Sequence, residues 1–408
     1  MSSYLIKLTP VGKFFFGGDM TFSVGVHERP KNGGKMTEEE QKQLEYNTRY
    51  SSYIIKSEKF PQQTSLLGML RFLLLRNSHD LFDVDKNIIK EGKREEIKNL
   101  IGEKGFTSSD NDDRKEENPE NSFGKIKKIS SCFLMKGYKD KDEKIPNIVT
   151  KLPMDYDLKK IDVSATSSLS YNDNQIYLSK VVSGEKENGD EVLYSAKDGI
   201  STRFGNGKET YENSDIFIED ERIGINRDIQ TGHTENNALF KQVNYRLAAG
   251  FCFAFYAEID IANEIIKDYS NQVVSLGADN SQFVVQISPA VFQQPTIPPS
   301  NVTTKGCYGK IVLTSPALID KDTVKQADFA IAETIPFKFM QTTIDLKSYH
   351  RLSGSIQHSK KTFLFQTGSV FYFRLSDGFE SFKSGLEKRK DFQQIGYNQY
   401  QTVCYNND

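Results

Sequence analysis

Two stretches of the chain share one pattern of hydrophobic and polar positions. In each, a glycine precedes an apolar run, a stretch of helical character follows, and a second glycine precedes another apolar run. The paired glycines are Gly250 with Gly277 and Gly368 with Gly396, at intervals of 27 and 28 residues. Strand, helix, glycine turn and strand make up half of a ferredoxin-like βαββαβ unit. We therefore predict two such units, with chance similarity of two glycine-containing loops as the alternative.

The apolar runs of these stretches have the length of strands rather than of membrane spans. The run that follows Gly250 is aromatic and apolar at nearly every position, which is typical of a fully buried strand. The predicted strands are Phe251–Ile259, Gln282–Ile287, Val370–Leu375 and Tyr400–Tyr405, and the predicted helical stretches are Ile261–Gly277 and Phe379–Leu386.

The clearest helix is Phe60–Asn77, which is apolar nearly all round and must therefore be buried against a sheet. Its first turn, after Gln62 and Gln63, presents backbone N–H groups and is a candidate anion site. Arg71 lies further along this helix. Its guanidinium could reach an RNA or form an ion pair at the helix rim.

The polar stretch before Gly250, from Glu219 onward, is rich in turn-forming residues such as Gly224 and Gly232. We predict a long exposed loop that feeds the buried strand. A loop tied to a rigid strand can hold polar side chains out to a ligand. The candidates in this loop are Arg222, Asn226, Arg227, Thr231, His233, Lys241 and Arg246.

Two other loops combine glycines with basic residues. Val11–Gly18 contains Lys13 and three phenylalanines, of which Phe14 is the first. Phenylalanines in such a loop either stack on bases or fill the core at a domain edge. Gly199–Gly207 is a second exposed loop, and it contains Arg203.

These elements predict an α+β protein with tandem ferredoxin-like (RRM/RAMP-like) domains and long loop insertions. The first domain is predicted over residues 1–288 and the second over residues 289–408, joined by the proline-rich segment Pro289–Ser300. Residues 80–125 are charge-dense and predicted to be partly disordered, above all Ser108–Asn121. Deletion of residues 105–122 is accordingly expected to cost little stability.

The amino-acid composition indicates the class of protein but does not identify a ligand. The chain of 408 residues has 53 basic and 55 acidic residues, so its net charge does not indicate a nucleic-acid partner. The two ends are mildly basic and the middle is acidic, which permits a basic groove. The four cysteines match no zinc spacing, and no signal peptide or membrane span is visible. We therefore expect a reduced, cytoplasmic protein.

No known catalytic motif occurs in the sequence. A catalytic histidine needs a positioned partner, and neither His27 nor His233 has a persuasive one in the sequence. The acidic cluster Glu219–Glu221 could bind a metal, with a solvated turn as the alternative reading. We therefore expect no enzymatic activity, no metal and no cofactor.

The chain resembles the Cmr-module RAMP subunit that binds the five-prime end of the guide RNA in type III-B CRISPR effector complexes. The central matching segment is the most specific one. In this chain Gly277 and Gly396 each stand nearly alone where the family has several glycines. The matching segments are Pro10–Gly18, Phe60–Arg71, Arg222–Leu247, Gly368–Arg374 and Ile395–Val403.

The resemblance implies a subunit without catalysis of its own. It would hold the repeat-derived five-prime tag of the guide RNA and dock the large polymerase-like subunit. It would stand beside the backbone RAMP subunits, meet target RNA only indirectly and contact no membrane. Residue types and resemblance together predict these RNA-binding residues: Lys13, Phe14, Gln62, Gln63, Arg71, Arg203, Arg222, Asn226, Arg227, Thr231, His233, Lys241, Arg246, Tyr397 and Asn398.

Two readings of other classes remain open. The first is a guide-RNA processing ribonuclease of the same superfamily, with His27 or His233 as its acid or base. The second is a structural adaptor whose exposed loops bind protein only.

Overall fold

The computed structural model describes most of the chain. The described residues are 2–17, 54–85, 88–102, 106, 123–137, 147–163, 169–172, 175–178, 182–186, 191–194, 201–227, 234–342, 356–359 and 361–405. No helix in these ranges is long and apolar enough to cross a membrane.

The first sheet has β1 (Ser2–Pro10) at its centre, antiparallel to both of its neighbours. On one side lies β19 (Gln282–Pro289), and on the other lies β17 (Phe251–Ile259), followed by β6 (Phe133–Lys136). The order β19-β1-β17-β6 is that of a ferredoxin-like βαββαβ sheet. It confirms the predicted fold class for this half, and β17 is almost completely buried, as its apolar run predicts.

The helices of this first unit differ in length. Helix α2 (Gln63–Arg76) follows β1 along the chain and buries six leucines and Met69 in the largest core cluster. The second helix, α5 (Asn263–Lys267), is much shorter than the predicted stretch Ile261–Gly277. The chain leaves the helix early and forms strand β18 (Val273–Ser275), which pairs with β19.

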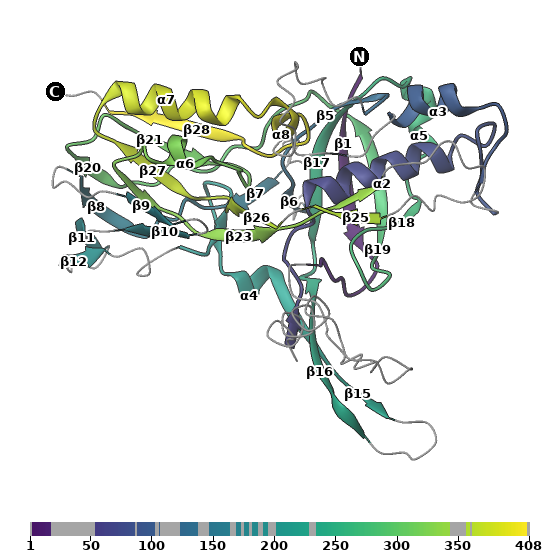
Figure 1. Cartoon of the computed structure of the whole chain (residues 1–408), viewed down its shortest axis with the longest axis horizontal. Helices are drawn as coiled ribbons and strands as arrows, with labels where there is room; N and C mark the ends of the chain where they lie inside the picture. Colours follow the sequence, from purple (N-terminus) through teal and green to yellow (C-terminus); the bar gives the residue numbers. More distant parts are fainter. Residues whose placement is uncertain are drawn as a thin grey trace, which may run out of the picture.

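The second sheet repeats the arrangement with strand order β22-β27-β21-β28, antiparallel throughout. Helix α7 (Ser376–Glu387) packs Phe379 and Phe382 against this sheet. Figure 1 shows this yellow helix beside β28. The other elements of the repeat are β21 (Gly309–Leu313), α6 (Lys321–Val324), β22 (Phe329–Ile331), β27 (Val370–Phe373) and β28 (Tyr400–Cys404).

The four glycines that suggested the repeat have matching backbone geometry. Gly250 and Gly368, which precede β17 and β27, both have φ of 88°. Gly277 and Gly396, in the turns before the last strands, both have φ of 90°. This left-handed region is open to glycine at little cost and strains other residues. The repeat is therefore a property of the fold and not a chance similarity of loops.

The stretch predicted as a long loop is a β-hairpin, so that prediction is wrong. Strand β15 (Phe217–Arg227) pairs antiparallel with β16 (Thr234–Leu247), and β2 (Ile54–Lys56) adds a short parallel strand at its base. Figure 1 shows the hairpin projecting from the body. Its polar residues form a two-stranded ribbon because the backbone N–H and C=O groups of each strand hydrogen-bond to those of the other. The turn-forming residues within the strands, such as Gly224, made this pairing hard to predict from the sequence.

The charge-dense insertion is partly built into the fold. Helix α3 (Arg94–Ile101) buries Ile97 and Ile101, and Phe106 is 5% exposed, with its ring 5.3 Å from Phe339 and 5.1 Å from Phe392. Deleting residues 105–122 would remove this core phenylalanine, so the predicted deletion begins two residues too early. The segment Ser108–Asn121 lies outside the described residues.

The two halves of the chain share core. The first includes residues 147–163, which pack Met154 and Leu158 against Val312 and Tyr372 of the second half. The division at residue 289 stays a prediction. The remaining elements are β3 (Phe82–Asp83), β4 (Ile88–Ile89), β5 (Ile126–Ile129), β7 (Asn147–Lys151), β8 (Leu158–Asp162), β9 (Leu169–Asn172), β10 (Gln175–Leu178), β11 (Val182–Lys186), β12 (Glu191–Tyr194), β13 (Phe204–Gly205), β14 (Thr210–Tyr211), α4 (Asn213–Ile216), β20 (Thr303–Lys305), β23 (Thr334–Phe337), β24 (Met340–Thr342), β25 (Ile356–His358), β26 (Thr362–Phe365) and α8 (Lys390–Gln394).

Candidate nucleic-acid interface

The base of the β15–β16 hairpin is fixed to the body by the segment after β1. The backbone N–H of Phe14 donates to the Tyr245 carbonyl oxygen at 2.8 Å, and the Tyr245 N–H donates back at 3.1 Å. Phe14 is 1% exposed, and its ring meets Phe253 of β17 edge-on at 5.3 Å. Of the two readings for Phe14, core packing is the one observed. Its ring is closed to a base in this structure.

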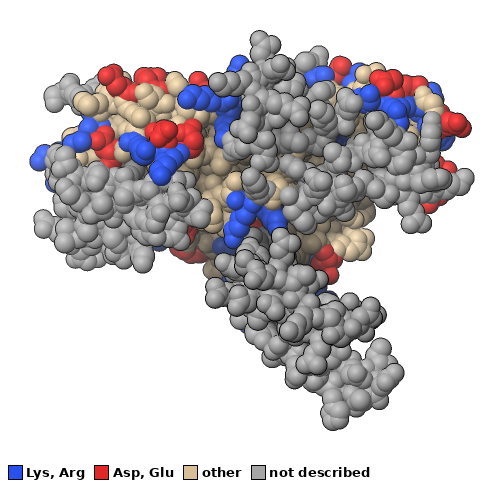
Figure 2. All heavy atoms as spheres, in the orientation of Figure 1, with Lys and Arg blue, Asp and Glu red and all other residues tan. Residues whose placement is uncertain are grey.

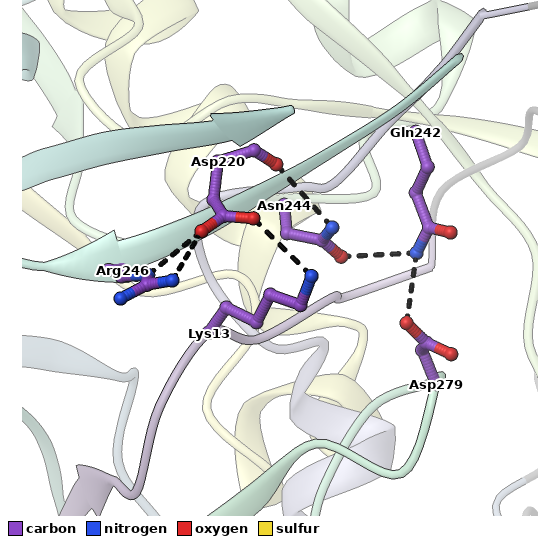
Figure 3. Close-up of polar contacts among 6 residues, drawn as sticks. All are labelled: Lys13, Asp220, Gln242, Asn244, Arg246 and Asp279. Carbon is purple, nitrogen blue, oxygen red and sulfur yellow. Dashed lines mark hydrogen bonds and ion pairs between the residues drawn. The ribbon is translucent and has the colours of Figure 1, made fainter. Parts of the chain in front are cut away.

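Asp220 on β15 holds two of the cations predicted to contact RNA. Its carboxylate accepts hydrogen bonds from Nε and Nη2 of Arg246 at 2.9 and 2.5 Å, and from Nζ of Lys13 at 3.3 Å (Figure 3). The bonds from Arg246, more than those from Lys13, lower the pKa of Asp220 below its usual value. Both cations are therefore bound by a carboxylate of the chain itself.

Two more ion pairs run along the ribbon. Lys241 on β16 lies 2.7 Å from Glu221, and Lys56 at the end of β2 lies 2.6 Å from Glu219. Lys241 faces Ile223 in the ladder, so its carboxylate partner lies two residues along, the diagonal position that long side chains reach. The hydrogen bond to Glu219 raises the pKa of Lys56 and lowers that of Glu219.

Buried amides continue the network toward the body. Nε2 of Gln242 donates to Oδ1 of Asn244 at 3.0 Å and to Oδ2 of Asp279 at 3.2 Å (Figure 3). Asp279 lies in the turn that follows Gly277, so the hairpin base is tied to the glycine turn of the first unit. This leaves the hairpin little freedom at its base.

Arg222 and Arg203 differ in their partners. Arg222 on β15 is exposed, and no ion pair holds it among the described residues. Arg203 lies before β13 and pairs with Asp157 at 3.1 Å and with Glu212 at 2.7 Å. Of the predicted cations in the described part of the chain, Arg222 is the one open to a phosphate without loss of an ion pair.

The N-terminus of α2 is covered by the second unit. Gln62 precedes the helix as its N-cap, and the backbone N–H of Gln63 donates to the Tyr397 hydroxyl at 3.1 Å. The side chain of Gln63 donates to the carbonyl oxygens of Ser130 and Gly396 at 3.1 and 3.2 Å. Burial of Tyr397 raises the pKa of its hydroxyl, which stays protonated. Gln63 and Tyr397 thus contact each other in the core.

Two further predicted residues are also tied into the fold. Asn398 is buried with φ of 53°, and its side chain both accepts from Leu318 N at 2.8 Å and donates to Leu318 O at 3.0 Å. Arg71 lies with its guanidinium 5.3 Å from the Phe123 ring centre, and burial lowers its pKa to about 10.

The side chains of Asn226 and Arg227, and residues Thr231 and His233, lie outside the described residues. The same holds for His27. Within the described ranges, no group of three His, Cys, Asp or Glu side chains is placed to hold a metal ion.

The family of the CRISPR-associated protein (Cas_Cmr3) matches residues 193–404, which is more than half of the chain. The chain belongs to this family. The resemblance to a Cmr-module subunit is thereby confirmed. The matched region contains the hairpin, β17 and the whole second unit. No curated protein matches the chain.

Among solved structures, this Cas_Cmr3 protein is remotely similar to chains of CRISPR complexes. Two are cryo-EM structures of the Type III-B Cmr-beta bound to cognate target RNA, one of them also with AMPPnP. Each is 13% identical, with 98% of this chain and 96% of that chain covered and TM-scores of 0.44 and 0.42. A third is the Csm3-Csm4 subcomplex of the type III-A interference complex, at 13% identity, 90% and 92% coverage and a TM-score of 0.30.

Sequence reasoning missed three lysines of this Cas_Cmr3 protein that lie near the hairpin base. They are Lys56, which ends β2, Lys59, which lies in the short segment between β2 and α2, and Lys151. The spacing of three residues between Lys56 and Lys59 was the available signal. Lys151 gave none, because only the folded chain brings β7 beside them.

Proposed function

We propose that this chain is a non-catalytic subunit of a type III-B CRISPR effector complex. It binds the repeat-derived five-prime tag of the guide RNA and docks the large polymerase-like subunit. The observation that carries this proposal is the β15–β16 hairpin, which projects from the body on a base fixed by Phe14, Tyr245 and Asp279. We expect the chain in the cytoplasm, beside the backbone RAMP subunits, with target RNA met only indirectly.

A two-stranded ribbon suits this role because its base is rigid and its side chains alternate between two faces. RNA bases that are unstacked can be read along such a surface, while cationic groups bind phosphates. Arg222 offers an exposed guanidinium on β15 that forms no ion pair with any residue in the described part of the chain. Lys241 and Arg246 are already paired with carboxylates, and exchanging these partners for phosphate would cost free energy. We therefore expect both to contribute less than Arg222 to the affinity for the tag.

The direct test is photo-crosslinking of the full chain to guide RNA that carries a photoactivatable base within the tag. We expect crosslinked peptides from residues 217–247. The matched control is guide RNA with the same base placed outside the tag, which should give few crosslinks there. Equal labelling of the hairpin by both RNAs, or none by either, would contradict tag binding.

A second candidate is a protein-only adaptor, and one observation favours it. Lys13, Lys241 and Arg246 are all neutralised by carboxylates of the hairpin. A ribbon with balanced charges can pair with a complementary protein surface. Assembly with the large subunit in the presence and absence of guide RNA separates the two functions. An adaptor would assemble equally well without RNA and would leave the tag unprotected from nuclease.

The absence of catalysis is part of the proposal. Repeat RNA incubated with the full chain should stay intact with or without divalent metal. Cleavage that disappears in His27→Ala or His233→Ala would favour the processing ribonuclease instead.

A further inference from the structure

Three lysines converge where the hairpin meets the body. Lys56 ends β2, Lys59 follows three residues later, and Lys151 ends β7. Their ammonium groups lie close enough to influence one another, since Lys56 and Lys59 form one repelling pair and Lys59 and Lys151 form another. On the face shown in Figure 2, Lys and Arg side chains gather at the place where the hairpin leaves the body.

An aromatic floor holds these lysines in place. The Lys59 ammonium lies 6.0 Å from the Phe217 ring centre, and the Lys56 ammonium lies 5.7 Å from that of Tyr245. Phe60 packs against Phe217 at 5.8 Å and against Phe204 at 5.9 Å. Phe204 in turn pairs with Lys151 in the β13–β7 ladder. The floor therefore joins β2, β7, β13 and the hairpin base beneath the lysines.

The three lysines differ in how fully they are paired. Lys56 has Glu219, and Nζ of Lys151 donates to Oε1 of Gln366 at 2.8 Å. Lys59 forms neither an ion pair nor a hydrogen bond with another described residue, although Glu58, Glu219 and Glu333 act on it from a distance. A half-buried ammonium without a partner is costly, and an incoming anion would relieve that cost.

We propose that Lys56, Lys59 and Lys151 form a phosphate-binding site at the hairpin base, and that its ligand is a phosphodiester of the guide RNA. This rests on the proposed function and names the cations that serve it. The two free oxygens of one phosphodiester can accept from two neighbouring ammonium groups, as charge-assisted hydrogen bonds. The site binds backbone and not base, so it fixes the register of the RNA without reading its sequence.

Lys151 gives the site a pH signature. Burial, with a smaller contribution from the repulsion of Lys59, lowers its pKa to about 8, against the attraction of Glu333. The groups that face it are Lys59 before α2, Glu333 before β23 and the neutral Gln366 after β26. A bound phosphate favours the ammonium form, so RNA binding draws a proton onto Lys151 whenever the solution is above its free pKa.

The test is guide-RNA affinity of the full chain as a function of salt and pH, with Lys59→Met, Lys151→Met and Lys151→Arg. Lys388→Met serves as the control, since Lys388 is an exposed lysine at the C-terminal end of α7 in the second unit. Lys59→Met should weaken binding by at least about tenfold at low salt, which is the lower end of what a hydrogen bond to a charged group contributes. It should also reduce the slope of log affinity against log salt by about 0.7. Lys388→Met should change neither.

For the wild-type chain, affinity should be constant below about pH 8 and fall up to about tenfold by pH 9, as one proton is taken up on binding. Lys151→Arg should keep the affinity and lose the pH dependence, because a guanidinium stays charged. Lys151→Met should lose both. Wild-type pH dependence in Lys151→Arg, or wild-type affinity and salt slope in Lys59→Met, would overturn the site while leaving tag binding intact.

Failure of the proposed function has a different outcome. Guide RNA with a scrambled tag would then bind as tightly as the natural guide, and Lys59→Met would weaken both equally. That result would support the phosphate site and contradict the proposal that the chain recognises the tag. A competing acidic peptide gives a further check. If it displaces guide RNA equally well from the wild-type chain and from Lys59→Met, the peptide and the RNA compete for a surface that does not include Lys59, and the result would count against the proposed site.

Discussion

The hydroxyl oxygen of Tyr397 accepts a hydrogen bond from the backbone N–H of Gln63 at 3.1 Å, across 334 residues of sequence. Gln63 is the first residue of α2, where backbone N–H groups have no partner within the helix. Tyr397 follows Gly396, whose carbonyl oxygen accepts from the Gln63 side chain. The glycine turn of the second unit therefore closes the N-terminus of the long helix of the first.

This contact predicts a stability role for Tyr397. Tyr397→Phe leaves the buried Gln63 N–H without an acceptor, and we expect the free energy of unfolding to fall by about 1–3 kcal/mol. Urea denaturation of the full chain measures it. The control is Tyr156→Phe, because the half-buried Tyr156 hydroxyl has no hydrogen bond in the described part of the chain, and it should change stability by less than about 0.5 kcal/mol. Equal stability of the two variants would contradict the role.

Lys151 predicts a dependence of stability on pH. Burial lowers its pKa to about 8 in the folded chain, below its ordinary value of 10.5. The unfolded chain therefore binds this proton more tightly, and the free energy of unfolding rises as pH increases from about 8 to about 10.5. Lys151→Met removes the buried charge, and we expect it to stabilise the fold at pH 7 by about 1–3 kcal/mol.

Denaturant melts of wild type and Lys151→Met over about pH 7–10 give the comparison, with the difference between them reporting on this lysine alone. The difference should shrink as pH rises. A variant that is less stable than wild type at neutral pH would show that the ammonium is satisfied in the folded state.

The fold was largely predictable because its central strands coincide with short apolar runs in the sequence. Phe251–Ile259 and Val370–Phe373 are buried at nearly every position, and the glycines around them mark turns that other residues strain to form. The hairpin was not predictable in the same way. Its ion pairs, such as Glu221 with Lys241 and Asp220 with Arg246, form only when the two strands pair. The distance between the partners along the sequence follows no periodic pattern that would have predicted them.

The candidate site was less predictable than the fold, since exposure is a property of tertiary structure. Phe14, Tyr397 and Asn398 each lie within two residues of a glycine, a pattern typical of loops. Each is nevertheless buried, because a distant segment covers its loop. Lys59 and Lys151 went unnoticed for the opposite reason. They are unremarkable in sequence and meet only across the aromatic floor.

Arg222 and Arg246 offer a matched pair on the ribbon. Arg222 is exposed without an ion pair in the described ranges, whereas Arg246 is bound to Asp220 at 2.9 and 2.5 Å. We expect Arg222→Met to reduce the slope of log guide-RNA affinity against log salt by about 0.7 and to leave the melting temperature unchanged. Arg246→Met should lower the melting temperature and leave the slope unchanged, because its charge is already neutralised.

Fluorescence titrations with guide RNA at several salt concentrations measure the salt slope of each variant, and thermal melts measure its melting temperature. The reverse pattern, with the salt slope reduced by Arg246→Met alone, would mean that the carboxylate gives up its arginine to RNA. The hairpin would then change its internal pairing on binding.

The last prediction concerns the two glycine turns that contain Gly277 and Gly396. In this structure they lie against the chain itself. A Cβ on Gly396 would stand 2.5 Å from the Ser130 carbonyl oxygen and from Nε2 of Gln63, and one on Gly277 would stand 2.5 Å from the Phe15 carbonyl oxygen. Both residues have φ of 90°, so a side chain adds backbone strain to the clash.

We therefore expect Gly396→Ala and Gly277→Ala each to lower the free energy of unfolding by at least about 2 kcal/mol, combining a strained φ with a displaced backbone neighbour. Gly68→Ala is the control, because Gly68 lies on the exposed side of α2 with no atom within 4 Å of an added Cβ. It should raise stability by about 0.5–1 kcal/mol through helix propensity. Chemical denaturation measures all three. If Gly396→Ala and Gly277→Ala kept full stability but lost guide-RNA affinity, the turns would open in solution, and their close contacts would be made with RNA instead of with Ser130 and Phe15.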